Sequence, residues 1–151
     1  MLCEAMPGLM NLKRKKMIRT YSDLIKIPTF KERFEYLKLR PEDDYHALRK
    51  FRYLNQRFYN SCEWKSVRNQ VRIRDNGFDL GCEGFDISGR IYIHHMNPIT
   101  IEDLEIRSPK LLDMENLISC SFDTHEAITY SDENLLPKPF IARKPGDTLL
   151  W

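Results

Sequence analysis

The spacing of the apolar residues changes along this chain close to Asn76-Gly77. Before this point, apolar side chains recur every three to four residues, which is typical of helices with one buried side. After it, short stretches alternate between apolar and polar residues, which is typical of β-strands. A chain of 151 residues, 42% of them hydrophobic, can form one core. We therefore predict an α+β domain, with a helical part over about 22–75 and a core containing strands over about 78–131.

Three helices are predicted in the first part, and they span about 29–39, 43–59 and 61–75. Thr29-x-x-Glu32 has the form of a capping box, which marks the start of the first helix. Ser61 can cap the third helix, and Asn76-Gly77 can end it.

The second part begins with a hairpin signal. Ser88-Gly89 is a suitable two-residue turn, and it lies between two stretches that favour strands, 85–87 and 91–93. A long connection with prolines follows and leads to a short apolar stretch, Leu117-Ile118. A helix capped by a serine is predicted over 121–130, and an irregular tail over 135–151.

Basic and acidic residues are unevenly distributed. Residues 1–74 carry 18 Lys and Arg against 8 Asp and Glu, whereas residues 75–151 carry 6 against 14. Such a distribution favours a basic surface for a polyanion such as DNA beside an acidic region for a cation, although solvated helix faces would give the same composition. Residues 1–16 lack apolar periodicity and are predicted to be a mobile basic tail that precedes a domain over 17–151.

Two classes of protein do not fit this composition. No apolar run approaches the roughly 18–20 residues that cross a bilayer, and no basic segment precedes a continuous apolar one as in a secretory signal. We therefore expect a cytoplasmic protein with no membrane partner. The four cysteines lie far apart, so structural disulfides are not expected.

Three histidines and one asparagine of the second part form a pattern with chemical meaning. His94-His95 closes a predicted strand, Asn116 follows the long connection, and His125 lies on the final helix. A divalent ion needs ligands from separate elements, and hydrolysis of a phosphodiester needs a general base beside that ion. Neighbouring residues on a strand point to opposite faces, so we expect one histidine of the doublet to be a ligand and the other the base.

These residues resemble the signature of the HNH endonuclease family, whose ββα-metal fold cuts DNA. The resemblance is carried by Ile91–Pro98, Met114–Ile118 and Cys120-x4-His125. Weaker similarity to HNH proteins of bacteriophages and prophages extends it over about residues 17–151, in the segments Tyr53–Gln56, Glu63-Trp64, Arg74–Gly77, Asp79–Gly81, Pro145–Thr148 and Trp151. The resemblance implies an α+β fold with a ββα-metal core behind an N-terminal helical part.

The resemblance also implies roles for the four residues. His94 and His125 would be the protein ligands of a divalent metal ion, which could be Mg, Mn, Ni or Zn, and His95 would be the general base. Asn116 would orient His95 by accepting a hydrogen bond from its far ring nitrogen.

Two departures from the family pattern concern metal binding. Many HNH proteins hold a structural zinc with two C-x-x-C pairs, but only Cys82 and Cys120 are present here, with Asp79 and Asp123 at the partner positions. A zinc site with four cysteines is therefore excluded, and we interpret the two cysteines as small core residues. Thr129 stands where related phage proteins often have a third histidine.

The resemblance thus implies a phage-encoded, metal-dependent DNA endonuclease. Arg68, Arg72 and Arg74 precede the metal core and are the predicted phosphate contacts. Two alternatives remain open: a DNA-binding module that has lost catalysis on the same fold, and an accessory factor that binds phage DNA-packaging proteins.

Overall fold

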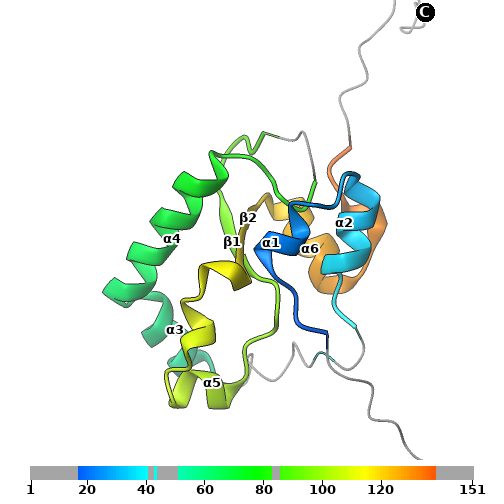
Figure 1. Ribbon diagram of the computed structural model, residues 1–151. Helices are drawn as coiled ribbons and strands as arrows, with labels where there is room; N and C mark the ends of the chain where they lie inside the picture. Colours follow the sequence, from blue (N-terminus) through cyan, green and yellow to red (C-terminus); the bar gives the residue numbers. More distant parts are fainter. Residues whose placement is uncertain (1–16, 41–42, 44–50, 83–85, 139–151) are drawn as a thin grey trace, which may run out of the picture.

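A two-stranded antiparallel sheet lies at the centre of the protein (Figure 1). The computed structural model describes residues 17–40, 43, 51–82 and 86–138. Strand β1 (Tyr92–His95) pairs with β2 (Leu117–Cys120), with Tyr92 opposite Cys120 and His95 opposite Leu117. Helices surround the sheet, so the predicted α+β class is confirmed.

The helices described before the sheet are α1 (Tyr21–Leu24), α2 (Phe30–Leu37), α3 (Arg52–Tyr59) and α4 (Cys62–Asp75). Short polar side chains cap α1, α2 and α4, whereas α3 follows Phe51 without a side-chain cap. The hydroxyl groups of Thr20, Thr29 and Ser61 accept hydrogen bonds from backbone N–H groups in the first turns of α1, α2 and α4. Helix α4 ends as predicted, because Asn76 adopts the left-handed conformation with a φ of 51°.

The connection between the strands is structured. It contains α5 (Ile101–Glu105) and two 3₁₀ helices, η2 (Pro109–Leu111) and η3 (Met114–Asn116). Thr100 and Asp103 form a capping box at the start of α5, which the sequence analysis did not identify. Strand β2 leads directly into α6 (Phe122–Tyr130), which is capped by Ser121 as predicted, and η4 (Glu133–Leu135) follows.

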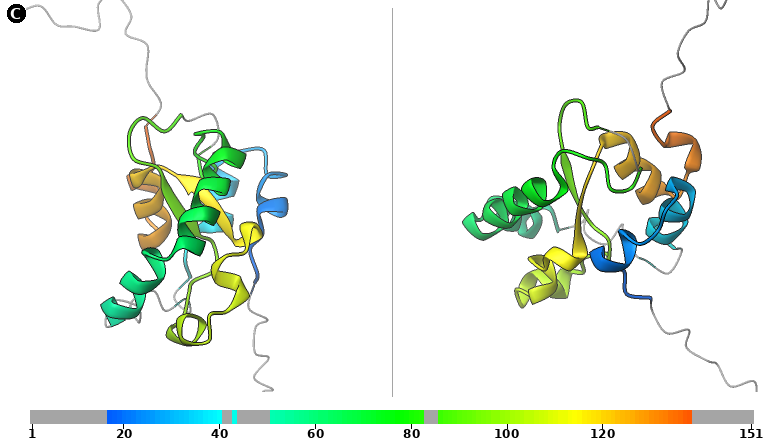
Figure 2. Two further views of the ribbon diagram at one scale, coloured as in Figure 1. Left: turned by 90° about the vertical axis from the view of Figure 1, so that its left-hand side faces the viewer. Right: turned by 45° about the horizontal axis from the view of Figure 1, so that its top comes forward.

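The sheet buries both of its faces. Helices α3, α4 and α5 lie on one side and α1, α2 and α6 on the other, and α4 and α6 remain on opposite sides in both views of Figure 2. Leu117 packs with Trp64 and Val71 of α4, whereas the next residue, Ile118, packs with Ile128 of α6. Strands of four residues are too short to be stable alone, so these two apolar clusters hold the sheet in place.

The structure differs from the predicted hairpin and describes only part of the predicted helix over 43–59. The predicted hairpin is wrong, because β1 pairs with 117–120, and Asp86 instead forms an isolated bridge with Phe78. The predicted helix over 43–59 is confirmed from Arg52 onward, and most of its first half lies outside the described residues. The predicted tail over 1–16 and most of the C-terminal tail also lie outside them.

The described helices of this protein are short. Of the helices in the described ranges, none has the length and apolar character that crossing a bilayer requires.

Candidate active site

The end of β1 places its two histidines on opposite faces of the sheet, as the strand period predicts. His94 faces α6, where its ring meets the ring of His125 edge-on with 5.4 Å between centroids. His95 faces α4, where it stacks on Trp64 with a centroid distance of 5.2 Å and an interplanar angle of 18°. One residue step along the strand therefore separates two chemical environments.

All three histidines nevertheless line one cavity. It has a volume of about 100 Å³ and is bounded by Leu39, Tyr59, Ile93, His94, His95, Pro98, Ile99 and His125. Its lining includes the last residues of β1 together with Pro98 and Ile99, which follow the strand, so rings from both faces of the sheet reach it. A ligand here would contact the proposed metal ligands and the proposed base together.

The ring of His95 is held in one neutral form. Its Nε2 lies 3.0 Å from the carbonyl oxygen of Leu111. Because a carbonyl only accepts hydrogen bonds, Nε2 carries the proton, and Nδ1 of the neutral ring keeps its lone pair. Burial lowers the pKa of His95 to about 4, against the weaker opposing effect of the Leu111 bond, so the ring is unprotonated at neutral pH.

His94 presents an unused nitrogen. Its side chain is buried, and its Nε2 has no hydrogen-bond partner among the described residues. Burial, together with the nearby His125 and His95, holds the pKa of His94 well below its usual value, so this ring is also neutral. His125 is partly exposed, with Nδ1 3.4 Å from a carboxylate oxygen of Glu126. Neutral imidazole is the form that binds metal ions.

Asn116 does not contact His95 in the way predicted. Its Oδ1 accepts hydrogen bonds from the backbone N–H and the side-chain amide of Asn97, at 2.9 and 2.7 Å. Its Nδ2 donates to the carbonyl of Lys110, the residue before the Leu111 carbonyl that binds His95. The predicted direct bond is therefore wrong, and Asn116 instead holds the backbone segment on which the His95 ring rests.

This network reaches a residue that the sequence analysis did not single out. Arg19 and Asn97 exchange hydrogen bonds between backbone and side chain, both at 2.8 Å. The buried Arg19 guanidinium also donates to the carbonyls of Tyr36, Lys38 and Met96, and pairs with Asp43 at 3.4 Å. The segment before α1 is thereby tied to the end of β1. The place of Arg19 within the stretch of weaker family resemblance, about residues 17–151, was the available sequence signal.

Asp79 connects the segment before β1 to the helix that carries His125. Its buried carboxylate accepts hydrogen bonds from the backbone N–H groups of Gly81 and Cys82 through Oδ1, and from Ser121 N–H and Thr124 Oγ1 through Oδ2. Cys82 and Cys120 are free and buried, as expected of core residues. A carboxylate thus joins the two segments that carry these cysteines.

The three predicted phosphate contacts differ in their accessibility. Arg72 is exposed, and Arg68 is partly exposed with its Nε buried and unpaired among the described residues. Arg74 donates to the carbonyls of Met114 and Leu117, both at 2.7 Å, and pairs with the neighbouring Asp75. These bonds to the backbone around β2 leave the Arg74 guanidinium less available to a phosphate than that of the exposed Arg72.

The donor set for a metal is small. Within the described residues, no three His, Cys, Asp or Glu side chains are grouped so that they could hold a metal ion. His94 and His125 are the available pair, with solvent or substrate oxygens left to complete a coordination shell. Thr129 is buried on α6, one turn after His125, and its Oγ1 has no partner among the described residues.

Comparisons with family models, curated proteins and solved structures give no match to this chain.

Proposed function

We propose that this protein is a divalent-metal-dependent DNA endonuclease of the HNH type. The observation that carries the proposal is the single cavity lined by His94, His95 and His125, in which two rings are held neutral by burial and face opposite sides of the sheet. The chain order of β1, β2 and α6 agrees with a ββα-metal core. On this proposal the enzyme is phage-encoded and acts in the cytoplasm of a bacterial host.

His94 and His125 would hold the ion. The fit is supported by the buried Nε2 of His94, because an unpaired imidazole nitrogen in the interior is costly unless a ligand occupies it. A divalent ion bound there, whether Mg, Mn, Ni or Zn, would supply charge stabilisation for the phosphate and the departing oxygen.

His95 would act as the general base. Its Nδ1 takes a proton from the attacking water, the new P–O bond forms, and the bond from phosphorus to O3′ breaks. The Leu111 carbonyl holds Nε2–H throughout and stabilises the imidazolium that results. Negative charge arriving with the phosphate raises the pKa of the ring, which offsets the lowering by burial.

Asn116 and Arg72 have supporting roles in this proposal. Asn116 positions His95 through the backbone of residues 110 and 111, rather than by direct contact. Arg72 is exposed on α4 and can bind a DNA phosphate, and Arg68 can contribute to phosphate binding through the exposed part of its side chain.

Plasmid nicking by the full chain, with Mg, Mn, Ni or Zn and with a chelator control, tests the proposal. His95→Ala is expected to lower the nicking rate by roughly 10²- to 10⁴-fold while metal affinity, measured by calorimetry, is retained. His125→Ala is expected to lower both. Wild-type protein that binds DNA but nicks with none of these metals would show instead a binding module without catalysis. Near-normal nicking by His95→Ala, with its fold confirmed by circular dichroism, would refute the assignment of the base.

A further inference from the structure

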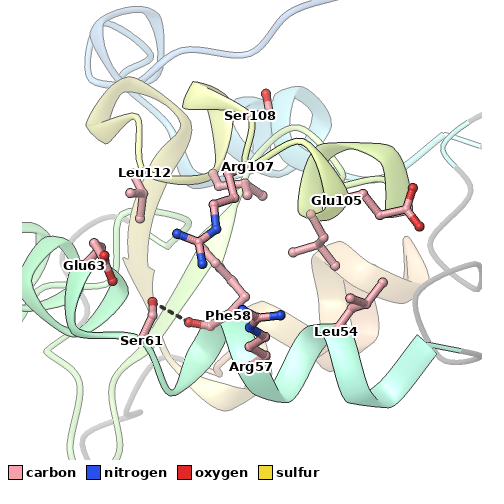
Figure 3. Close-up of a pocket in the computed structure, with 11 residues that line it drawn as sticks. Leu54, Arg57, Phe58, Ser61, Glu63, Glu105, Arg107, Ser108 and Leu112 are labelled. Carbon is pink, nitrogen blue, oxygen red and sulfur yellow. Dashed lines mark hydrogen bonds between the residues drawn. The ribbon is translucent and has the colours of Figure 1, made fainter.

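A second cavity, of about 380 Å³, lies between α3, the start of α4 and the segment from α5 to η2 (Figure 3). Its apolar lining is contributed by Leu54, Phe58, Leu104, Leu111 and Leu112. This volume is within the range of roughly 300–1,000 Å³ that is usual for small-molecule sites. An apolar lining with one aromatic ring is suited to a flat, weakly polar group such as a nucleobase.

Two arginines reach this cavity without partners. Arg57 of α3 and Arg107, which follows α5, both line it, and neither side chain forms a hydrogen bond or ion pair within the described parts of the chain. Figure 3 shows the Arg107 guanidinium extending into the middle of the view, above that of Arg57. Glu63 and Glu105 also line the cavity, but the Glu105 carboxylate points away from both arginines. The pair is therefore available to bind an anionic group.

The backbone of Arg107 is unusual for its residue type. Arg107 has a φ of 50°, in the left-handed region, and the Ser108 N–H beyond it donates to the carbonyl of Asp103 at 2.8 Å. Glycine is the preferred residue at such a position after a helix, because a Cβ is unfavourable there. A strained arginine in the lining of a cavity suggests that its side chain has a use.

The cavity also adjoins the proposed base. Leu111, which lines it, provides the carbonyl that binds His95 Nε2. The ring of Phe58, also in the lining, lies 6.3 Å from the ring of His95, measured between centroids. A DNA strand whose phosphate reaches His95 therefore has neighbouring nucleotides within reach of this cavity.

From these observations we propose that the cavity binds one unstacked nucleotide of the substrate DNA strand. The base lies on the apolar lining around Phe58, and the phosphate lies between Arg57 and Arg107. This inference rests on the proposed nuclease function and adds to it the form of the substrate, which is DNA with a locally unpaired strand.

Binding measured in the presence of a chelator tests the inference separately from cleavage. Fluorescence anisotropy of the full chain would be recorded with a labelled short oligothymidylate and with an abasic phosphate chain of the same length. The variants are Arg57→Gln and Arg107→Gly; the control is Arg52→Gln, which removes an exposed arginine of α3 outside the cavity. Thermal midpoints of all variants would be measured in parallel.

Each cavity variant is expected to weaken binding of oligothymidylate by about tenfold, and Arg57→Gln to reduce the log–log salt slope by about 0.7. Arg107→Gly is expected to weaken binding although its thermal midpoint is unchanged or raised, because glycine relieves the left-handed strain. Arg52→Gln should bind nearly as wild type. The abasic chain should bind more weakly than oligothymidylate.

Three results would overturn the inference: cavity variants that bind like Arg52→Gln, an abasic chain that binds as tightly as oligothymidylate, or free thymidine 5′-monophosphate that competes as strongly as the strand. The last result would indicate a site for free nucleotides. Nicking by wild type together with any of these would refute this inference alone. Loss of binding in the cavity variants, with no nicking by wild type under any metal, would instead refute the proposed nuclease function.

Discussion

Removing the buried Asp79 carboxylate, in Asp79→Ala, is expected to destabilise the fold by about 3–5 kcal/mol. Asp79 is 1% exposed and accepts four hydrogen bonds, of which two come from the start of α6. Each bond to a charged acceptor contributes about 1.5–3 kcal/mol, but the four share one group and are not additive. The value therefore lies below their sum of about 6–12 kcal/mol.

Asp79→Asn separates the two halves of this interaction. An amide has one acceptor oxygen, so it can satisfy the donors of Gly81 and Cys82 or those of Ser121 and Thr124, but not both pairs. Its expected cost is about half that of alanine, roughly 2 kcal/mol. Thr124→Val combined with each variant gives a double-mutant cycle for the bond between Oγ1 and Oδ2.

Urea denaturation of the chelated protein measures these changes, and calorimetry measures metal affinity. Because α6 carries His125, Asp79→Asn is also expected to weaken metal binding. The control is Asp123→Asn, which removes the same charge from an exposed position in the first turn of α6 and should change stability by less than about 0.5 kcal/mol. A loss below about 1 kcal/mol for Asp79→Ala would refute the reasoning, because it would mean that these donors find other partners at no cost.

Three further predictions follow from burial and contacts. Burial lowers the pKa of His95 from 6.5 to about 4, so between these pH values the unfolded chain binds a proton that the folded protein excludes. Stability should therefore fall with decreasing pH by up to about 1.4 kcal/mol per pH unit. Urea midpoints measured from pH 7 to 4.5 would contradict this if His95→Gln showed the same dependence on pH as wild type. Arg74→Gln should lower stability by about 2–4 kcal/mol, since two carbonyls lose their donor and the buried Asp75 loses its cationic partner and keeps only the Ser119 N–H. Arg72→Gln should stay within about 0.5 kcal/mol in the same assay. The exposed Cys62 should react with iodoacetamide at pH 8 well before Cys82, because burial raises the pKa of the Cys82 thiol to about 11 and limits the access of the reagent to it. Equal reaction rates, measured by peptide mass spectrometry, would show that the segment near Asp79 opens readily.

Several features of the fold could be predicted because they depend on neighbouring residues. The caps at Thr29, Ser61 and Ser121 and the left-handed Asn76 satisfy backbone groups within one helical turn, so their sequence signals are complete. The opposite facing of His94 and His95 follows in the same way from the period of a strand.

The pairing of the strands could not be predicted in this way. Ser88-Gly89 is a good local turn signal, but β1 pairs with β2 across a connection that contains α5 and two 3₁₀ helices. This pairing places Leu117 against α4 and Ile118 against α6, and the apolar surface that it buries outweighs a local turn preference.

The sequence by itself determined the capped starts of α2, α4 and α6, the α+β composition and the set of histidines that could meet. Only the tertiary structure decided which partner each polar side chain has. Arg74 resembles its exposed neighbour Arg72 in sequence, yet it binds the backbone around β2. Asn116 stands at the position expected for a direct partner of His95, yet it binds Asn97 and the Lys110 carbonyl. The physical reason is that a buried donor or acceptor must be satisfied by whichever group the packing brings within about 3 Å, and sequence neighbours do not specify that group.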